Sequence, residues 1–181
     1  MKRALLVIDL QNDYFCGGAM ELNGAEKALE QTNSVIAYAR ASGYKIYFIQ
    51  HFSTREGATF FIPNTKGVKL NANLDRKDEL VIEKHYPNSF RETILQEELE
   101  KEQIEELIVC GAMSHMCIDS TVRAGFDFGY SMIVVEDACA TRDLIFASKT
   151  ISAKEVHGSY MSALGSVFAQ IVDSETFITE K

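Results

Sequence analysis

Residues 1–14 read MKRALLVIDLQNDY, and the order of residue types in this stretch decides the fold. A short continuous apolar run, residues 4–8, is typical of a strand that is buried on both faces of a parallel sheet. The run ends at Asp9, and polar residues follow it to Asp13, so it is too short for the apolar region of a signal peptide. We therefore predict a buried strand with polar side chains at its carboxyl end.

Similar apolar runs recur along the chain, and patterns typical of helices lie between them. The other predicted strands cover residues 45–49, 80–82, 107–110, 132–135 and 171–172. The predicted helices cover residues 25–41, 90–102, 116–124 and 152–164, and their expected carboxyl-terminal caps include Gly43, Gly125 and Gly165. Alternating strands and helices form an open, mainly parallel sheet with helices on both faces. We therefore predict a three-layer α/β/α fold of the Rossmann-like kind.

The composition indicates one globular domain that covers residues 1–181. Hydrophobic residues make up 46% of the chain and charged residues 24%, a balance typical of globular proteins. The formal net charge of −8 provides no basic patch, so we expect neither nucleic acid nor an anionic membrane surface as a partner. No segment approaches the roughly 20 apolar residues of a membrane-spanning helix. The expectation is a cytoplasmic protein that acts on a small molecule.

Polar residues follow the apolar runs at the edge where a parallel sheet binds its ligands, the carboxyl ends of its strands. Asp9 follows the first run, Lys84 the third and Cys117 the fourth, and they supply a carboxylate, a cation and a nucleophile. A cation and a helix amino terminus both lower the pKa of a thiol, so we expect Lys84 and the helix that begins near Cys117 to hold the sulfur ionised. Asp9 would then carry the thiol proton to the leaving group.

A structural interpretation is open for the same residues. Cysteine is often simply a small buried residue, and Asp9 and Lys84 would in that case form an ordinary ion pair. The remaining cysteines, Cys16, Cys110 and Cys139, have no comparable neighbours in the sequence, and we expect them to be structural, reduced thiols.

Five further residues near this edge of the sheet are predicted to bind substrate: Phe15, Gln50, His51, Tyr86 and Phe90. The aromatic residues would line an apolar pocket that excludes water, with core packing as the alternative. His51 would bind a polar group of the substrate or be held in place by a structural hydrogen bond. Residues 52–78 show no periodicity, and a loop of that length is usually functional, so we expect it to cover the active site.

Several stretches of the chain resemble the isochorismatase-like cysteine hydrolases, which include nicotinamidases, N-carbamoylsarcosine amidohydrolase and ureidoacrylate amidohydrolase. They are DLQNDY (9–14), EKHYPNSF (83–90), CGAMSHMCIDSTVRAGFDFGY (110–130), EDACATRD (136–143) and ISAKEVHGSYMSAL (151–164). The resemblance implies a six-stranded parallel sheet, a homo-oligomer and a catalytic triad of Asp9, Lys84 and Cys117. It also implies a cis peptide bond between Ala112 and Met113, with the N–H groups of Met113 and Cys117 as the oxyanion hole.

The mechanism that the resemblance implies is attack of Cys117 on a carbonyl, loss of ammonia or an amine, and hydrolysis of the thioester by water that Asp9 activates. Isochorismatases proper cleave a vinyl ether, and some lack the cysteine. Cys117 therefore favours C–N hydrolysis of a small amide, ureide or carbamoyl compound, with vinyl ether hydrolysis and an inactive scaffold as alternatives.

One departure concerns metal binding. Nicotinamidases carry an Asp-x-His metal motif after the second strand, where this chain has Gln50-His51-Phe52-Ser53. A single histidine is too few for a zinc site, so we expect no metal and no other cofactor.

Overall fold

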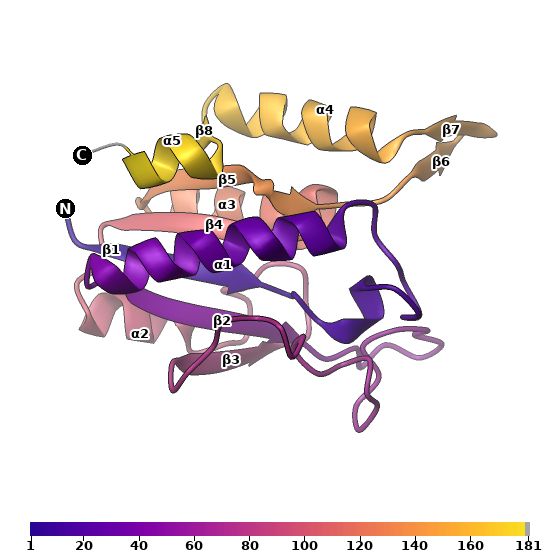
Figure 1. Ribbon diagram of the computed structural model, residues 1–181, viewed down its shortest axis with the longest axis horizontal. Coiled ribbons are helices and arrows are strands. Elements are labelled where there is room, and N and C mark those ends of the chain that lie inside the picture. Colours follow the sequence, from indigo (N-terminus) through magenta and orange to yellow (C-terminus); the bar gives the residue numbers. More distant parts are fainter. Residues whose placement is uncertain (180–181) are drawn as a thin grey trace.

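One parallel sheet of six strands organises residues 1–179, which the computed structural model describes (Figure 1). The strand order is β3-β2-β1-β4-β5-β8, and every pairing is parallel. The strands are β1 (Arg3–Ile8), β2 (Lys45–His51), β3 (Leu80–Lys84), β4 (Glu106–Ala112), β5 (Ser131–Ala140) and β8 (Gln170–Val172). The helices are α1 (Ala25–Ala41), α2 (Leu95–Lys101), α3 (Asp119–Asp127), α4 (Ala153–Gly165) and α5 (Ser174–Thr179).

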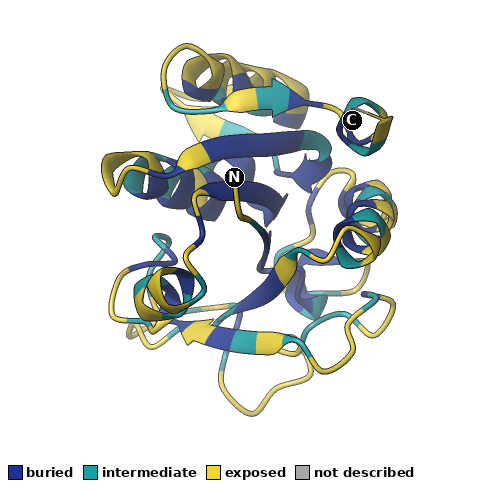
Figure 2. Ribbon diagram, turned by 90° about the vertical axis from the view of Figure 1, so that its left-hand side faces the viewer, coloured by how far each residue is buried: buried dark blue, intermediate teal, exposed yellow. Residues whose placement is uncertain are grey.

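Helices cover both faces of the sheet and form the outer two of three layers. Buried side chains of α1 and α5 share one core with one face of the sheet. Buried side chains of α2, α3 and α4 share a second core with the other face. Figure 2 shows the buried central strands between these two helical layers. The predicted α/β/α fold is therefore confirmed.

The continuous apolar runs arise because the central strands face both cores. In β1, Leu5 and Val7 belong to the α1 side, whereas Ala4, Leu6 and Ile8 belong to the α2 side. Side chains alternate between faces along a strand, so burial of both faces demands an apolar residue at every position. All of these side chains are at most 1% exposed.

Several predicted boundaries are displaced, two of them by five residues. The helix expected from residue 90 begins only at Leu95, because residues 87–94 form turns in which Thr93 Oγ1 donates to Ser89 O. The strand expected to end at residue 135 continues to Ala140. Its register against β4 shifts, since Val109 pairs with Val134 but Gly111 pairs with Cys139.

Of the three predicted helix caps, only Gly43 is correct, with a φ of 72° just after α1. Gly125 lies inside α3, where a Cβ would come within 2.8 Å of the Met132 sulfur. Gly165 is the last residue of α4 and packs against Ile171. Both positions need a small residue for packing rather than for a turn.

The sequence did not predict α5, nor an antiparallel hairpin formed by β6 (Leu144–Phe146) and β7 (Lys149–Ile151). Within residues 1–179, no helix combines the length and apolar composition needed to cross a membrane.

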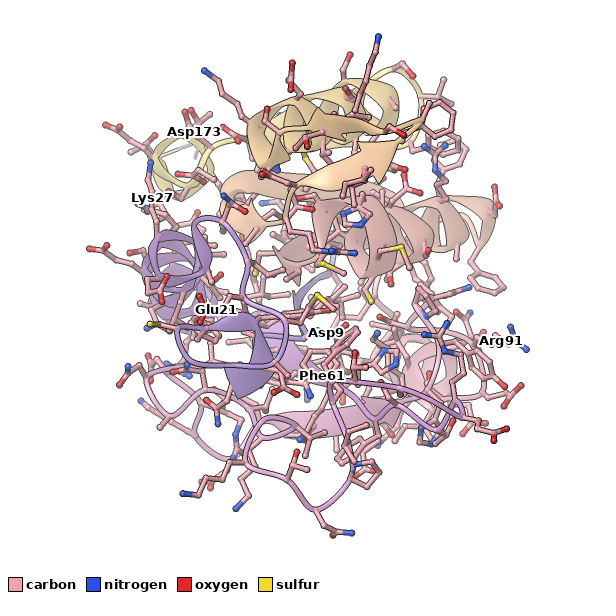
Figure 3. All side chains as sticks on the ribbon, turned by 90° about the vertical axis from the view of Figure 1, so that its right-hand side faces the viewer. Asp9, Glu21, Lys27, Phe61, Arg91 and Asp173 are labelled. Carbon is pink, nitrogen blue, oxygen red and sulfur yellow. The ribbon has the colours of Figure 1, made fainter. Side chains whose placement is uncertain are left out.

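The loop of residues 52–78 packs against the segment that follows β1. Asn12 N donates to Lys69 O and Asp13 N donates to Gly67 O, at 2.9 and 3.0 Å. Figure 3 looks onto this end of the molecule, with Asp9 and Phe61 near its centre. The loop thus lies at the carboxyl end of the sheet, where the sequence predicted the active site.

Candidate active site

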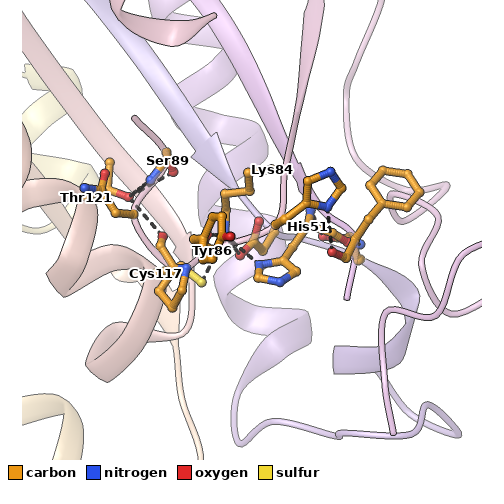
Figure 4. Close-up of polar contacts among 12 residues, drawn as sticks. His51, Lys84, Tyr86, Ser89, Cys117 and Thr121 are labelled. Atoms are coloured by element: carbon orange, nitrogen blue, oxygen red, sulfur yellow. Dashed lines mark hydrogen bonds and ion pairs between the residues drawn. The ribbon is translucent and has the colours of Figure 1, made fainter. Parts of the chain in front are cut away.

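The ammonium group of Lys84 is the centre of a buried polar cluster. Its Nζ lies 2.8 Å from Asp9 Oδ2, 2.9 Å from His51 Nδ1, 3.1 Å from Cys117 Sγ and 3.1 Å from Tyr86 O (Figure 4). Lys84 and Asp9 are 0% exposed, and Cys117 is 4% exposed. The structure therefore brings together all three residues of the predicted triad.

Strand ends position these groups. Asp9 directly follows β1, and its φ of 55° turns the chain out of the strand direction. Lys84 ends β3, and its long side chain reaches past β2 to Asp9. Gly111 lies in β4 with a φ of 120°, and a Cβ there would overlap the carbonyl of Ile8. Only glycine therefore allows β1 and β4 to approach this closely beside the site.

Lys84 is a charged ammonium in the folded protein. Burial alone would lower its pKa, but the negative charge of Asp9 and the Cys117 sulfur outweigh burial, so the pKa is raised. A buried cation needs such partners, because transfer of an uncompensated charge out of water costs several kcal/mol.

Cys117 is a thiol in the resting site. Burial and the negative charge of Asp9 raise its pKa to about 12, and they outweigh the opposite effect of Lys84. The raised pKa runs against the expectation that Lys84 holds the sulfur ionised, and the part assigned to a helix end stays a prediction. Asp9 Oδ1 is buried without a hydrogen-bond partner among the described residues, so it is free to accept the thiol proton during attack.

His51 is neutral, and its tautomer follows from its partner. An ammonium only donates hydrogen bonds, so Nδ1 of His51 accepts from Lys84 and the ring hydrogen is on Nε2. Burial and the charge of Lys84 lower the pKa of His51 to about 4. Gln11 fixes the His51 backbone, because its Oε1 accepts from His51 N at 2.7 Å and its Nε2 donates to His51 O at 2.9 Å.

Aromatic rings form a wall beside the cluster. The ring of Phe61 lies 4.6 Å from that of Tyr14 and 5.8 Å from that of His51, centroid to centroid. Asp13 holds this wall in place, since its carboxylate accepts from Phe61 N at 2.6 Å. Burial, with the negative charge of Asp9 nearby, raises the pKa of Tyr14 well above its usual value, so its hydroxyl stays protonated.

Tyr86 and Gln50, which were also predicted to bind substrate, make contacts within the protein. Tyr86 contributes its carbonyl to Lys84, while its ring packs 3.6 Å from the Arg91 guanidinium. Gln50 donates to Val68 O at 2.9 Å and so holds the long loop.

Two of the predicted substrate-binding residues pack against other parts of the chain. Phe15 lines a separate hollow of about 360 Å³ with residues 66–67 and 71. The ring of Phe90 packs against Phe128 and Tyr130 in the core below α3. For these two aromatic residues, the alternative interpretation of core or loop packing is the better one.

The segment of residues 111–117, which we call the oxyanion loop, connects β4 to the nucleophile. The peptide bond between Ala112 and Met113 is cis. A π-helical turn, η2 (Ser114–Ile118), follows and carries Cys117. The Met113 carbonyl closes this turn by accepting from Met116 N and Ile118 N at 3.0 and 3.3 Å. The role of the Met113 and Cys117 N–H groups as oxyanion donors stays a prediction.

Sequence reasoning missed Arg142 and Tyr14 as candidate site residues. Arg142 comes just after β5, and its Nε is buried without a hydrogen-bond partner among the described residues. Its positive charge opposes the rise in the pKa of Tyr14. Burial and, after it, the charge of Arg142 lower the pKa of His115. The misplaced end of β5 hid Arg142, because the apolar pattern predicts that this strand ends at residue 135 and it continues to Ala140.

Three side chains of the cluster have the ligand types of a metal site. One donor atom each from Asp9, His51 and Cys117 lies within 4.8 Å of the others. Lys84 Nζ, however, already contacts all three side chains at hydrogen-bond distances of 2.8, 2.9 and 3.1 Å. The donor set as arranged fits an ammonium ion, and a divalent cation would have to displace it.

Comparison with known proteins gives consistent matches. The family model for the isochorismatase domain matches residues 3–174. The isochorismatase family protein YddQ of Bacillus subtilis (strain 168) is 45% identical over 179 residues, 98% of this chain and 99% of YddQ. Streptothricin hydrolase of Streptomyces noursei is 32% identical over 78% of this chain and 51% of that protein. More distant matches include a nicotinamidase of Escherichia coli (strain K12) and a ureidoacrylate amidohydrolase of Acinetobacter baylyi, at 25% and 24% identity.

A crystal structure of an isochorismatase-type hydrolase from Oleispira antarctica superimposes with a TM-score of 0.94 at 40% identity. The match covers 99% of this chain and 97% of that one. Both the fold and the sequence likeness therefore extend over nearly the whole described chain.

Proposed function

The chain belongs to the isochorismatase family of hydrolases, and we propose that it is a metal-independent cysteine hydrolase. It would cleave a C–N bond of a small amide, ureide or carbamoyl compound through a thioester on Cys117. One observation carries this proposal: a single buried ammonium, Lys84 Nζ, contacts both the Asp9 carboxylate and the Cys117 sulfur, at 2.8 and 3.1 Å.

The first half of the reaction starts from the thiol. Asp9 Oδ1 takes the proton of Cys117 as the sulfur bonds to the substrate carbonyl carbon, and Lys84 stabilises the sulfur as its negative charge develops. The carbonyl oxygen becomes an oxyanion held by the N–H groups of Met113 and Cys117. Asp9 then donates the proton to the nitrogen, the C–N bond breaks, and ammonia or an amine leaves.

The second half hydrolyses the thioester. Asp9, again a carboxylate, removes a proton from water as the water oxygen bonds to the acyl carbon. The C–S bond breaks, the acid product leaves, and the proton passes from Asp9 to restore the Cys117 thiol. Lys84 remains charged throughout, since its raised pKa keeps the ammonium from serving as the proton donor.

An anionic group on the substrate is favoured by Arg142. Its buried Nε lacks a partner among the described residues, and an unpaired buried donor costs about 1–3 kcal/mol. A carboxylate would satisfy it and would gain a charge-assisted hydrogen bond. We expect the best substrates to carry a carboxylate or similar oxygen acceptor beside the scissile amide.

The test is a substrate screen with detection of the intermediate. Amides, ureides and carbamoyl compounds, each with and without a carboxylate, are incubated with the Cys16→Ser protein, which removes the one exposed cysteine among the four. We expect release of ammonia or amine and an acyl adduct on Cys117 in the peptide mass spectrum. Cys117→Ala should abolish both, with an unchanged fold by circular dichroism.

Other outcomes separate the alternatives. Release of pyruvate from isochorismate that persists in Cys117→Ser would indicate vinyl ether hydrolysis. An inert Cys117 and no turnover of any compound would indicate a scaffold protein.

A further inference from the structure

We propose that Ser114, His157 and Glu136 form a hydrogen-bonded relay that positions the oxyanion loop for acyl transfer at Cys117. The inference rests on the proposed function. The three residues act as positioning residues, because their hydrogen bonds join one another and the end of β5 rather than the groups around Lys84.

The relay links three separate elements. Ser114 opens η2, the turn that also carries Cys117, and its side chain is fully buried. Its Oγ lies 2.8 Å from His157 Nδ1 on α4 and 3.4 Å from Ala140 O at the end of β5. The other ring nitrogen, His157 Nε2, lies 3.1 Å from Glu136 Oε2.

The direction of each hydrogen bond follows from the chemistry of the groups. An ionised carboxylate only accepts, so His157 Nε2 carries a hydrogen and donates to Glu136. In the neutral imidazole, Nδ1 is then bare and accepts the Ser114 hydroxyl hydrogen. In the imidazolium form, Nδ1 donates to Ser114 Oγ and the hydroxyl turns to Ala140 O. Ser114 is therefore held from the same side in both charge states.

An irregularity in β5 determines the position of Glu136. The register shift between Val109 and Gly111 places extra residues of β5 opposite Cys110, and Glu136 lies among them. Bulges of this kind redirect side chains and are common beside active sites. A regular strand would not present Glu136 to α4 in this way, so the bulge and the relay belong together.

The relay matters because the oxyanion loop must be placed accurately. Displacement of a catalytic group by about 1 Å can cost on the order of 100-fold in rate. Serine, histidine and an acid also form the catalytic triad of serine hydrolases. Here the Ser114 hydroxyl is fully buried and its hydrogen bonds go to His157 and Ala140 O, so the same contacts serve to hold the loop.

Two reagents separate positioning of the loop from reactivity of the sulfur. In acylation by p-nitrophenyl acetate, the Cys117 sulfur bonds to the carbonyl carbon, p-nitrophenolate leaves and the thiol proton goes to Asp9. This step forms an oxyanion. Alkylation by iodoacetamide displaces iodide from a saturated carbon and forms none. Both are measured in the Cys16→Ser background, with the modified peptide identified by mass.

The variants are Ser114→Ala, His157→Ala, His157→Asn and Glu136→Gln. We expect Ser114→Ala and His157→Ala to slow acylation about ten-fold or more, with alkylation of Cys117 within two-fold of the parent. Asn at position 157 keeps an acceptor near the Nδ1 position and should restore most of the acylation rate. Glu136 is 40% exposed, so Glu136→Gln should fold normally and show a smaller loss.

The results that overturn the relay are distinct from those that overturn the function. Equal loss of acylation and alkylation, or no rescue by Asn, would show a merely structural role. Unchanged acylation in Ser114→Ala and His157→Ala would remove the relay altogether. A parent protein that is alkylated at Cys117 but never acylated would refute the oxyanion loop, and the relay with it.

Discussion

Nζ of Lys84 lies 2.9 Å from Nδ1 of His51, so one buried cation fixes both the charge and the tautomer of the neighbouring ring. The histidine is neutral because burial, and then a second positive charge beside the ammonium, lower its pKa, and its Nε2–H is left to donate. A histidine at a strand end is thereby converted into a hydrogen-bond donor that does not titrate near neutral pH.

The lowered pKa of His51 predicts an acid-dependent loss of stability. The unfolded histidine titrates near its ordinary value of 6.5, whereas the folded one titrates at about 4. Between these values the unfolded chain binds the extra proton, so this contribution is present above pH 6.5 and is lost as pH falls through 4. It amounts to up to about 3 kcal/mol.

His51→Asn, which keeps an acceptor for Lys84, should lack this slope. The measurement is the free energy of unfolding by urea at several pH values for both proteins. Parallel curves between pH 6.5 and 4 would show that His51 is protonated in the folded protein.

Asp9→Asn should separate ionisation of the sulfur from catalysis. The Asp9 charge raises the pKa of Cys117 while Lys84 lowers it, so loss of that charge lowers the thiol pKa. We expect iodoacetamide to alkylate Cys117 faster at pH 7 in the variant, whereas turnover falls by about 10²–10⁴-fold without the proton carrier. Slower alkylation would instead assign Asp9 to ionisation of the resting thiol.

Lys84→Met should destabilise the protein by about 3–5 kcal/mol, because it leaves the Asp9 carboxylate buried without its cation. The double variant Asp9→Asn with Lys84→Met contains no buried charge at these positions and should recover part of this loss. Unfolding by guanidinium chloride measures all three free energies. Additive losses would show that the two residues are not coupled.

Arg142→Met should raise KM for carboxylate-bearing amides about ten-fold or more, in line with loss of a charge-assisted hydrogen bond. Neutral amides should be little affected, since they make no ion pair with the guanidinium. Arg76→Met is the matched control, because Arg76 is exposed and lies in the long loop. If both substrate classes lose equally, Arg142 has a structural role.

The sequence was sufficient for the fold wherever a strand faces both cores, since residues 4–8 of β1 and 107–112 of β4 carry no polar side chain. It failed at β5, where Glu136 and Asp137 resemble the end of a strand. The Asp137 carboxylate is in fact satisfied by Ser174 N and Oγ, both at 2.7 Å, from a helix start far along the chain. No local pattern reveals such a partner.

The sequence predicted the residues of the site but not their burial or all of their neighbours. Asp9, Lys84 and Cys117 were found because residues after parallel strands share one edge of the sheet. Local sequence does not report how deeply a group is buried, so the raised pKa of Cys117 was missed. The neighbours of Phe15 and Phe90 depend on turns that only the folded chain defines.

The complete burial of Asp9 and Lys84 has a consequence for the role of solvent. In the proposed reaction a single hydrogen ion moves from sulfur to carboxylate to nitrogen, and a second from water to carboxylate to sulfur. Neither step draws on bulk acid or base. Turnover at a fixed pH should therefore be independent of buffer concentration and buffer type.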